Sequence, residues 1–178
     1  MKIIGIDPGT NFTGYGILSF ENNEFKYTNS GVIALSKNFN MPERLKIIYS
    51  ELNNIIKTHK PDVVVIETAF YDKNVQSTLK IGYARGVAML VSANNNILAE
   101  EYSPREIKKA VVGNGSASKQ QVQYMIKSTL GLKRKMKFDE SDSLAVAMCY
   151  ALRNKTKKNK IKNWKSFVQQ NPDRIVKQ

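Results

Sequence analysis

The sequence predicts a single α/β domain in which a mixed sheet carries helices on both faces. Three observations support this fold. The first 35 residues contain three extended segments joined by tight turns, which is typical of an antiparallel meander. A helical pattern then alternates with short apolar runs, and the run over residues 62–67 is β-branched on both faces. Two-sided apolar runs of this kind belong to parallel strands that are covered by helices.

Five strands are expected, and two of them end on a carboxylate. The first strand ends at Asp7, after which Pro8 and Gly9 turn the chain. The fourth strand is the most uniformly apolar and ends on Glu67. A charge at the end of a buried strand is costly unless something pairs with it. The expected strands cover residues 2–7, 13–20, 25–35, 62–67 and 97–101.

Capping residues mark where three of the helices begin. An Asn or Ser is followed three positions later by Glu or Gln, the pattern of a capping box, at Asn40–Glu43, Ser103–Glu106 and Ser118–Gln121. The first of these helices should stop before Pro61 and bury a stripe made of Leu45, Ile48, Leu52 and Ile55. A long helix with little charge is expected over residues 74–95, and the last core helix from Asp139 to Leu152.

The composition changes near the end of the chain. From Arg153 onward, basic residues are frequent and Asp173 is the only acid. Such a segment cannot bury enough apolar surface to form a core of its own. We therefore divide the chain into a domain over residues 1–153 and a basic, flexible tail over residues 154–178.

Charge and composition restrict the class of function. The chain has 28 Lys and Arg against 15 Asp and Glu, a net charge of +13, which points first to nucleic acid as the partner. No apolar stretch is long enough to cross a bilayer, and the N-terminal run is too short for a signal peptide. A single cysteine fits a reducing cytoplasm and excludes a cysteine-based zinc cluster. Because there is also only one histidine, any metal chemistry must use carboxylates.

Four acids are candidates for that chemistry. Asp7 and Glu67 end two strands, and Asp139 and Asp142 lie three apart at the start of the last helix, on one helix face. If the two strands are neighbours, all four can converge. Oxygen ligands of this kind suit Mg²⁺ or Mn²⁺, and two such ions can stabilise the attacking and leaving oxygens of a phosphodiester displacement. Taken singly, each acid could instead be a turn residue, a strand end or a helix N-terminal charge.

Several motifs resemble the RuvC-type Holliday junction resolvases. They are Gly5-Ile6-Asp7-Pro8-Gly9, Thr13-Gly14-Tyr15-Gly16, Ile66-Glu67, Ala84-Arg85-Gly86 and Asp139-Glu140-Ser141-Asp142. The resemblance covers roughly residues 2–153. It implies an RNase H-like fold, a cytoplasmic bacterial homodimer, and two Mg²⁺ per active site, with Mn²⁺ able to substitute. It also implies symmetric incision of four-way DNA junctions in recombination and repair, giving 5′-phosphate and 3′-hydroxyl ends, together with the RuvA–RuvB branch-migration machinery.

The same resemblance assigns roles to individual residues. It makes Asp7, Glu67, Asp139 and Asp142 the catalytic metal ligands and has Lys119 stabilise the scissile phosphate. Phe70, with Tyr71 beside it, would stack on a base at the junction centre. Candidates for DNA backbone contacts are Arg85, Lys108 and Lys109, although Arg85 could instead support packing or the dimer. The basic loop over residues 133–137 has no assigned role.

Two other functions are compatible with parts of the pattern. Asp-Pro-Gly-Thr near the N-terminus is similar to the first phosphate loop of actin-like and sugar-kinase-like proteins, but those enclose ATP between two lobes and this chain has room for one. A non-catalytic junction-binding protein, in which the acids only shape the fold, is the second alternative. Metal-dependent cleavage would separate it from a nuclease.

Overall fold

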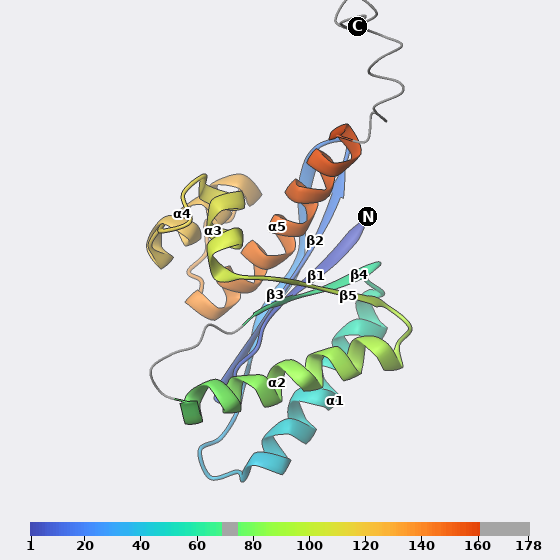
Figure 1. Ribbon diagram of the computed structural model, residues 1–178, viewed down its shortest axis with the longest axis vertical. Helices are drawn as coiled ribbons and strands as arrows, with labels where there is room; N and C mark the ends of the chain where they lie inside the picture. The colour runs from blue at the N-terminus through green and yellow to red at the C-terminus, as the bar shows by residue number, and fades with distance from the viewer. Residues whose placement is uncertain (69–74, 161–178) are drawn as a thin grey trace, which may run out of the picture.

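The computed structural model describes residues 1–68 and 75–160, with side chains up to residue 154. Its centre is a five-stranded sheet in the order β3-β2-β1-β4-β5 (Figure 1). The strands are β1 (Lys2–Asp7), β2 (Phe12–Glu21), β3 (Glu24–Ala34), β4 (Val63–Glu67) and β5 (Leu98–Tyr102). The first three pair antiparallel, and β4 and β5 extend the sheet in parallel to β1. The predicted mixed sheet is confirmed.

Parallel pairing of β1 with β4 decides where the site forms. The register aligns Ile3 with Val63 and Ile6 with Ile66, so the next residues on the two strands are Asp7 and Glu67. The two carboxylates therefore leave the sheet at the same edge. This neighbour relation is the condition on which the sequence argument depended.

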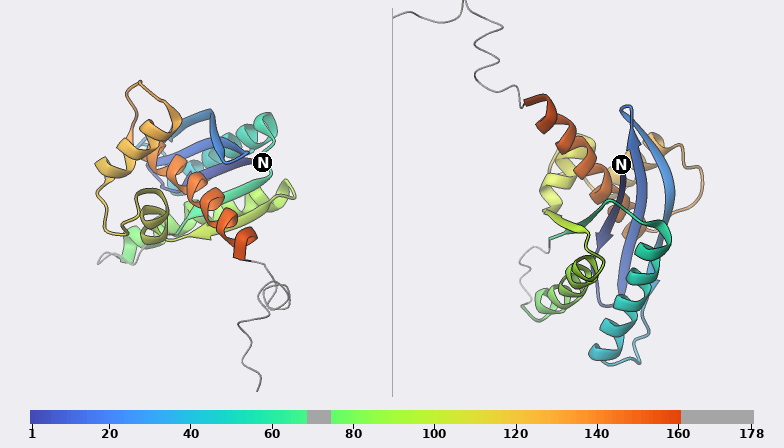
Figure 2. Two further views of the ribbon diagram at one scale, coloured as in Figure 1. Left: turned by 90° about the horizontal axis from the view of Figure 1, so that it is seen from above. Right: turned by 90° about the vertical axis from the view of Figure 1, so that its right-hand side faces the viewer.

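The helices form two layers, one on each face of the sheet (Figures 1 and 2). One face packs against α1 (Met41–His59) and α2 (Val75–Asn94). The other packs against α3 (Pro104–Val112), α4 (Lys119–Leu130) and α5 (Phe138–Lys160). Alternate strand residues supply the two cores, because successive side chains of a strand point to opposite faces. Within the described ranges, no helix combines the length and apolar character needed to cross a bilayer.

All three predicted capping boxes are present. In α1, α3 and α4 the cap side chain accepts from a backbone N–H and the third residue bonds back to the cap. Two details differ from expectation. At the C-terminal end of α1 the buried residue is Ile56, and Ile55 is only partly buried, because the apolar stripe turns slightly there. In addition, α5 continues to Lys160 and does not stop at Leu152, since nothing in that basic segment breaks a helix.

The helix α5 lies directly on the strands. A Cβ added at Gly5 of β1 would overlap the backbone oxygen of Ser143, and one added at Gly14 of β2 would overlap that of Asp139. Both clashes are with main-chain atoms, which cannot swing aside. The two glycines therefore allow the N-terminal half of α5, with its acids, to approach the centre of the sheet.

Candidate active site

The strand-end acids point to the face of the sheet that carries α3, α4 and α5. On β1, Ile4 and Ile6 belong to the opposite core, so Asp7 takes the α5 side by alternation. The same count on β4 places Glu67 there too, since Val63 and Val65 pack in that core. Both strands are fixed by backbone hydrogen bonds to their neighbours. The strand ladder therefore sets the positions of these two acids.

Three helices complete a cavity of about 230 Å³ over these carboxylates. From α5 comes Asp142, and from the first residue of α4 comes Lys119, whose Nζ donates a 2.8 Å hydrogen bond to Asp142 Oδ2. Lys108 of α3 lies at the same cavity. The lining residues are Asp7, Glu67, Pro104, Ile107, Lys108, Lys119, Val122, Asp142 and Ala145. Three acids and two lysines thus share the cavity with four apolar residues.

The fourth predicted acid, Asp139, stands beside this cavity and does not line it. It lies in the first turn of α5, against Gly14 of β2, which pairs with Asp7. Its charge acts on the site, because it raises the pKa of both Asp7 and Asp142. The structure therefore brings all four acids into one electrostatic group.

Burial and mutual repulsion disfavour the ionised forms of these carboxylates. Burial, followed by the neighbouring Asp142, raises the pKa of Asp7 to about 7. Burial, followed by the charge of Asp7, raises the pKa of Glu67 to about 8, although Lys119 and Lys108 act against the shift. Burial also raises the pKa of Asp142, in spite of the ammonium group bonded to it. Two lysines thus leave the four carboxylates only partly compensated.

The donor set suits a hard divalent cation. Carboxylate oxygens from two strands and a helix converge on a cavity with an excess of negative charge, which is what Mg²⁺ and Mn²⁺ sites offer. As the side chains stand, no three acidic, histidine or cysteine groups among residues 1–68 and 75–154 surround a common point at coordinating distance. The Lys119 ammonium holds Asp142 in this arrangement. The residues fit a cation that would draw them closer.

The remaining predicted DNA contacts divide into three groups. Lys108 lines the cavity, whereas Lys109 is exposed on α3 and is not among the residues around it. Arg85 of α2 forms a bidentate ion pair with Glu101 of β5, which is the packing role that the sequence left open. Phe70 and Tyr71 lie outside the described residues, and their stacking role stays a prediction.

Comparison with known proteins identifies the family. The family model described as crossover junction endodeoxyribonuclease RuvC matches residues 3–150. The chain belongs to the RuvC family. The RuvC of Geotalea uraniireducens is 48% identical over 151 residues, which cover 85% of this chain and 88% of that protein. The RuvC of Chloroherpeton thalassium is 39% identical over 186 residues, covering 99% and 100% of the two chains.

Solved structures agree with this RuvC assignment. The structure of Thermus thermophilus RuvC in complex with a Holliday junction substrate has a TM-score of 0.83 and 25% identity, covering 88% of this chain and 96% of that one. The yeast mitochondrial Holliday junction resolvase has a TM-score of 0.70 at 17% identity, covering 93% of this chain and 83% of that one, and supports the shared fold alone. The RNase H-like fold is therefore confirmed.

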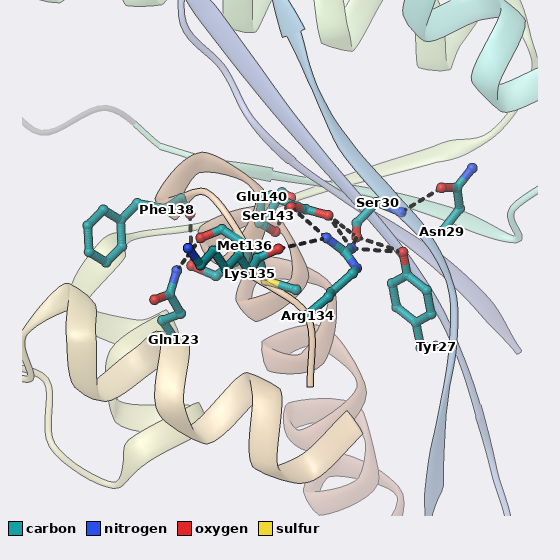
Figure 3. Close-up of polar contacts among 11 residues, drawn as sticks. Tyr27, Asn29, Ser30, Gln123, Arg134, Lys135, Met136, Phe138, Glu140 and Ser143 are labelled. Atoms are coloured by element: carbon teal, nitrogen blue, oxygen red, sulfur yellow. Dashed lines mark hydrogen bonds and ion pairs between the residues drawn. The ribbon is translucent and has the colours of Figure 1, made fainter. Parts of the chain in front are cut away.

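One polar cluster of this RuvC-family chain was missed in the sequence. Arg134, from the basic loop without an assigned role, binds Glu140 of α5 together with Ser30 and Tyr27 of β3 (Figure 3). Glu140 is 6% exposed although it lies between two candidate ligands. The only sequence signal was a third acid inside the Asp139–Asp142 motif, which looks like one more helix N-terminal charge.

Proposed function

We propose that this protein is a metal-dependent endonuclease that resolves four-way DNA junctions. The observation that carries the proposal is the convergence of Asp7, Glu67 and Asp142 on one cavity beside Lys119 and Lys108. The strongly basic chain suits a DNA substrate. The RuvC relatives are described as crossover junction endodeoxyribonucleases, which supports the same reaction. An actin-like domain is not favoured, because the family model of crossover junction endodeoxyribonuclease RuvC matches residues 3–150.

Four acids would hold the metal in this proposal. Asp7 and Glu67 would bind from the strand ends, and Asp139 and Asp142 from the first turns of α5. Mg²⁺ is proposed, with Mn²⁺ as a substitute, because all the donors are oxygens. When bound, such ions make a water molecule nucleophilic near neutral pH and stabilise the leaving oxygen. A bound cation would favour the ionised form of the four carboxylates, because it supplies the opposite charge.

The two lysines would handle the phosphate. Lys119 begins α4 and lines the cavity, so its ammonium group lies there at the positive end of that helix. In the present arrangement its Nζ neutralises Asp142. With Asp142 engaged as a metal ligand, Lys119 would be available to contact a non-bridging oxygen of the scissile phosphate. Lys108 would assist from α3.

We further propose a homodimer that uses the outer face of α2. Val75, Leu79, Tyr83 and Leu90 are about half exposed or more, at 65%, 51%, 48% and 52%. Helical spacing places them on one strip. Gly82 and Gly86 lie in the same strip and have open space around them. An apolar strip with small residues suits a two-fold contact, which would put two active sites on a symmetric junction. Cooperation with RuvA–RuvB is proposed on the family resemblance alone.

The proposal is tested with a labelled mobile four-way junction. We expect paired nicks at symmetric positions when Mg²⁺ is present and none when it is chelated, with 5′-phosphate and 3′-hydroxyl ends. A linear duplex of the same sequence should stay intact. The variant Asp7→Asn should bind the junction as the parent does and fail to cut it. Cleavage by that variant at the parental rate would falsify the metal assignment.

A further inference from the structure

We propose that the ion pair between Arg134 and Glu140 is a positioning device for the two helix-borne ligands, Asp139 and Asp142. The proposal rests on the proposed function, because it assigns these acids to the metal. Neither Arg134 nor Glu140 lines the cavity. Their role is to fix the rotation and the depth of the first turn of α5.

The carboxylate of Glu140 is buried and fully engaged. Arg134 Nη1 donates to Glu140 Oε2 at 3.2 Å, and Nη2 donates to Oε1. Ser30 Oγ donates to the same Oε1 at 2.6 Å. Both oxygens of this carboxylate therefore have hydrogen-bond donors, and the guanidinium among them carries the opposite charge. An ionised side chain that is 6% exposed needs such partners, since breaking one of them leaves an uncompensated buried charge.

The same arginine ties α5 to the sheet. Arg134 Nη2 donates to Tyr27 OH at 3.1 Å and to Ser30 Oγ at 3.0 Å, both on β3. The guanidinium also lies over the Tyr27 ring, 5.7 Å from its centroid (Figure 3). Gln123 of α4 adds a 3.0 Å hydrogen bond to the carbonyl oxygen of Met136 in the same loop. The loop before α5 is therefore held by a strand and a neighbouring helix.

These contacts replace a cap that α5 does not have. The helices α1, α3 and α4 begin with a Ser or Asn whose side chain accepts a backbone N–H. Before the first residue of α5 stands Lys137, which has no acceptor to offer. Glu140 stands three residues after Lys137, where a capping box has its acid, but its carboxylate is bound by Arg134 and Ser30. Arg134 and the two hydroxyl groups of β3 supply the constraint.

The position of Glu140 explains why this matters for the metal. Asp139 and Asp142 share one helix face, and Glu140 points about 100° away from Asp139 around the axis. Fixing Glu140 against β3 therefore fixes how far the other two turn toward Asp7. Ligands must be held within about 0.5 Å and 10–20° for tight binding, and loss of outer contacts costs roughly 10–100-fold in metal affinity.

The variant Arg134→Met tests the device. We expect the Mn²⁺ concentration that gives half of the maximal rise in unfolding temperature, measured without DNA, to increase about tenfold. The Mg²⁺ concentration for half-maximal junction cleavage should increase by the same factor. Junction affinity with the metal chelated should not change. Arg134→Lys, which keeps the charge but loses the planar fork, should give an intermediate shift.

A double variant separates positioning from simple stability. Arg134→Met combined with Glu140→Gln removes the buried charge together with its partner, which should restore much of the stability lost in the single variant. The metal requirement should stay raised if the ion pair positions α5. Recovery of the parental metal requirement along with stability would overturn the proposal. The double variant also keeps the test valid if Arg134→Met alone does not fold.

Arg153→Met is the matched control. It removes another arginine–glutamate pair of α5, with Glu106 at 2.8 Å, far from the acid-bearing turn. We expect no change in the metal requirement of this variant. A shift as large as that of Arg134→Met would overturn the proposal. Failure of the parent to cut junctions would instead contradict the proposed function, whereas parental Mn²⁺ binding by the Arg134 variants would contradict only the positioning role.

Discussion

The site has two halves that are held in different ways. Asp7 and Glu67 stand at the ends of adjacent parallel strands, where the backbone ladder and the core fix them. Asp139 and Asp142 stand on a helix that docks on β1 and β2 and is held at its start by the side-chain contacts of Arg134 and Glu140. The comparison teaches that the fold itself builds the first half, whereas individual side chains adjust the second.

The two halves also differ in charge compensation. Burial raises the pKa of Asp7 and Glu67 to about 7 and about 8, and neither carboxylate has an ion-pair partner among the described residues. Asp142 has the Lys119 ammonium at 2.8 Å. The two carboxylates of the strand half are therefore the ones that most require a cation. In the helix half, Asp142 is already paired with Lys119 of α4, which a cation could replace.

The largest expected effect is the loss of either half. Asp142→Asn should reduce cleavage roughly a hundred- to a thousandfold or more, as we also expect for Asp7→Asn, because both sides must hold the developing charge. Single-turnover cleavage of a labelled junction at saturating enzyme measures this. Junction binding without metal should stay at the parental level. A loss much smaller for Asp142→Asn than for Asp7→Asn would mean that the strand half works alone.

A glycine substitution should separate the halves. In Gly14→Ala the new Cβ would overlap the backbone oxygen of Asp139 and push the start of α5 off β2. We expect cleavage to fall at least about tenfold and the free energy of unfolding to fall by roughly 1–3 kcal/mol. Denaturant unfolding and cleavage assays on the same preparation measure both. Parental cleavage by a destabilised variant would show that α5 docking does not position Asp139.

The pH dependence of stability should come from the strand half. Because both pKa values are raised, the folded protein binds more protons than the unfolded chain between about pH 4 and pH 8. The free energy of unfolding of the metal-free protein should therefore fall as pH rises through this window. Asp7→Asn should flatten the fall, and Mg²⁺ should reduce it. Stability that is constant or rises from pH 5 to pH 8 would contradict the assigned cause.

The smallest effect is expected outside both halves. Arg85→Met removes the ion pair with Glu101 and should cost about 1 kcal/mol of unfolding free energy. It should leave the salt dependence of junction binding unchanged, because a guanidinium held by Glu101 is not available to a phosphate. Removal of an arginine that contacts a DNA phosphate would instead lower the salt slope by about one. Binding titrations at several salt concentrations distinguish the two results.

The strand half of the site could be predicted because its logic is local. A β-branched run that ends on an acid fixes both the strand and the place of its carboxylate, so Asp7 and Glu67 followed once β1 and β4 were taken as neighbours. The i, i+3 spacing of Asp139 and Asp142 was equally legible. The extent of α5 was not, because a lysine-rich segment has no apolar stripe to mark where a helix stops.

The contacts that hold the helix half could not be predicted. Ser30 and Glu140 are 110 residues apart in the chain, and Arg134 lies in a loop with no periodic pattern. Which hydroxyl of β3 meets that loop depends on how α5 packs on the sheet. The sequence shows the glycines of β1 and β2, but only the structure shows the close approach that they allow. The choice between DNA contact and packing for Arg85 was open for the same reason, because the sequence does not show that Glu101 of β5 faces α2.

The length of α5 has a mechanical consequence. From Asp142 to Lys160 the helix is uninterrupted, and at 1.5 Å per residue this amounts to roughly 27 Å. Its far portion carries the lysines of the basic segment and its near portion carries the acids. The acids and the first residues of the basic segment therefore lie on one continuous, rigid element of the protein.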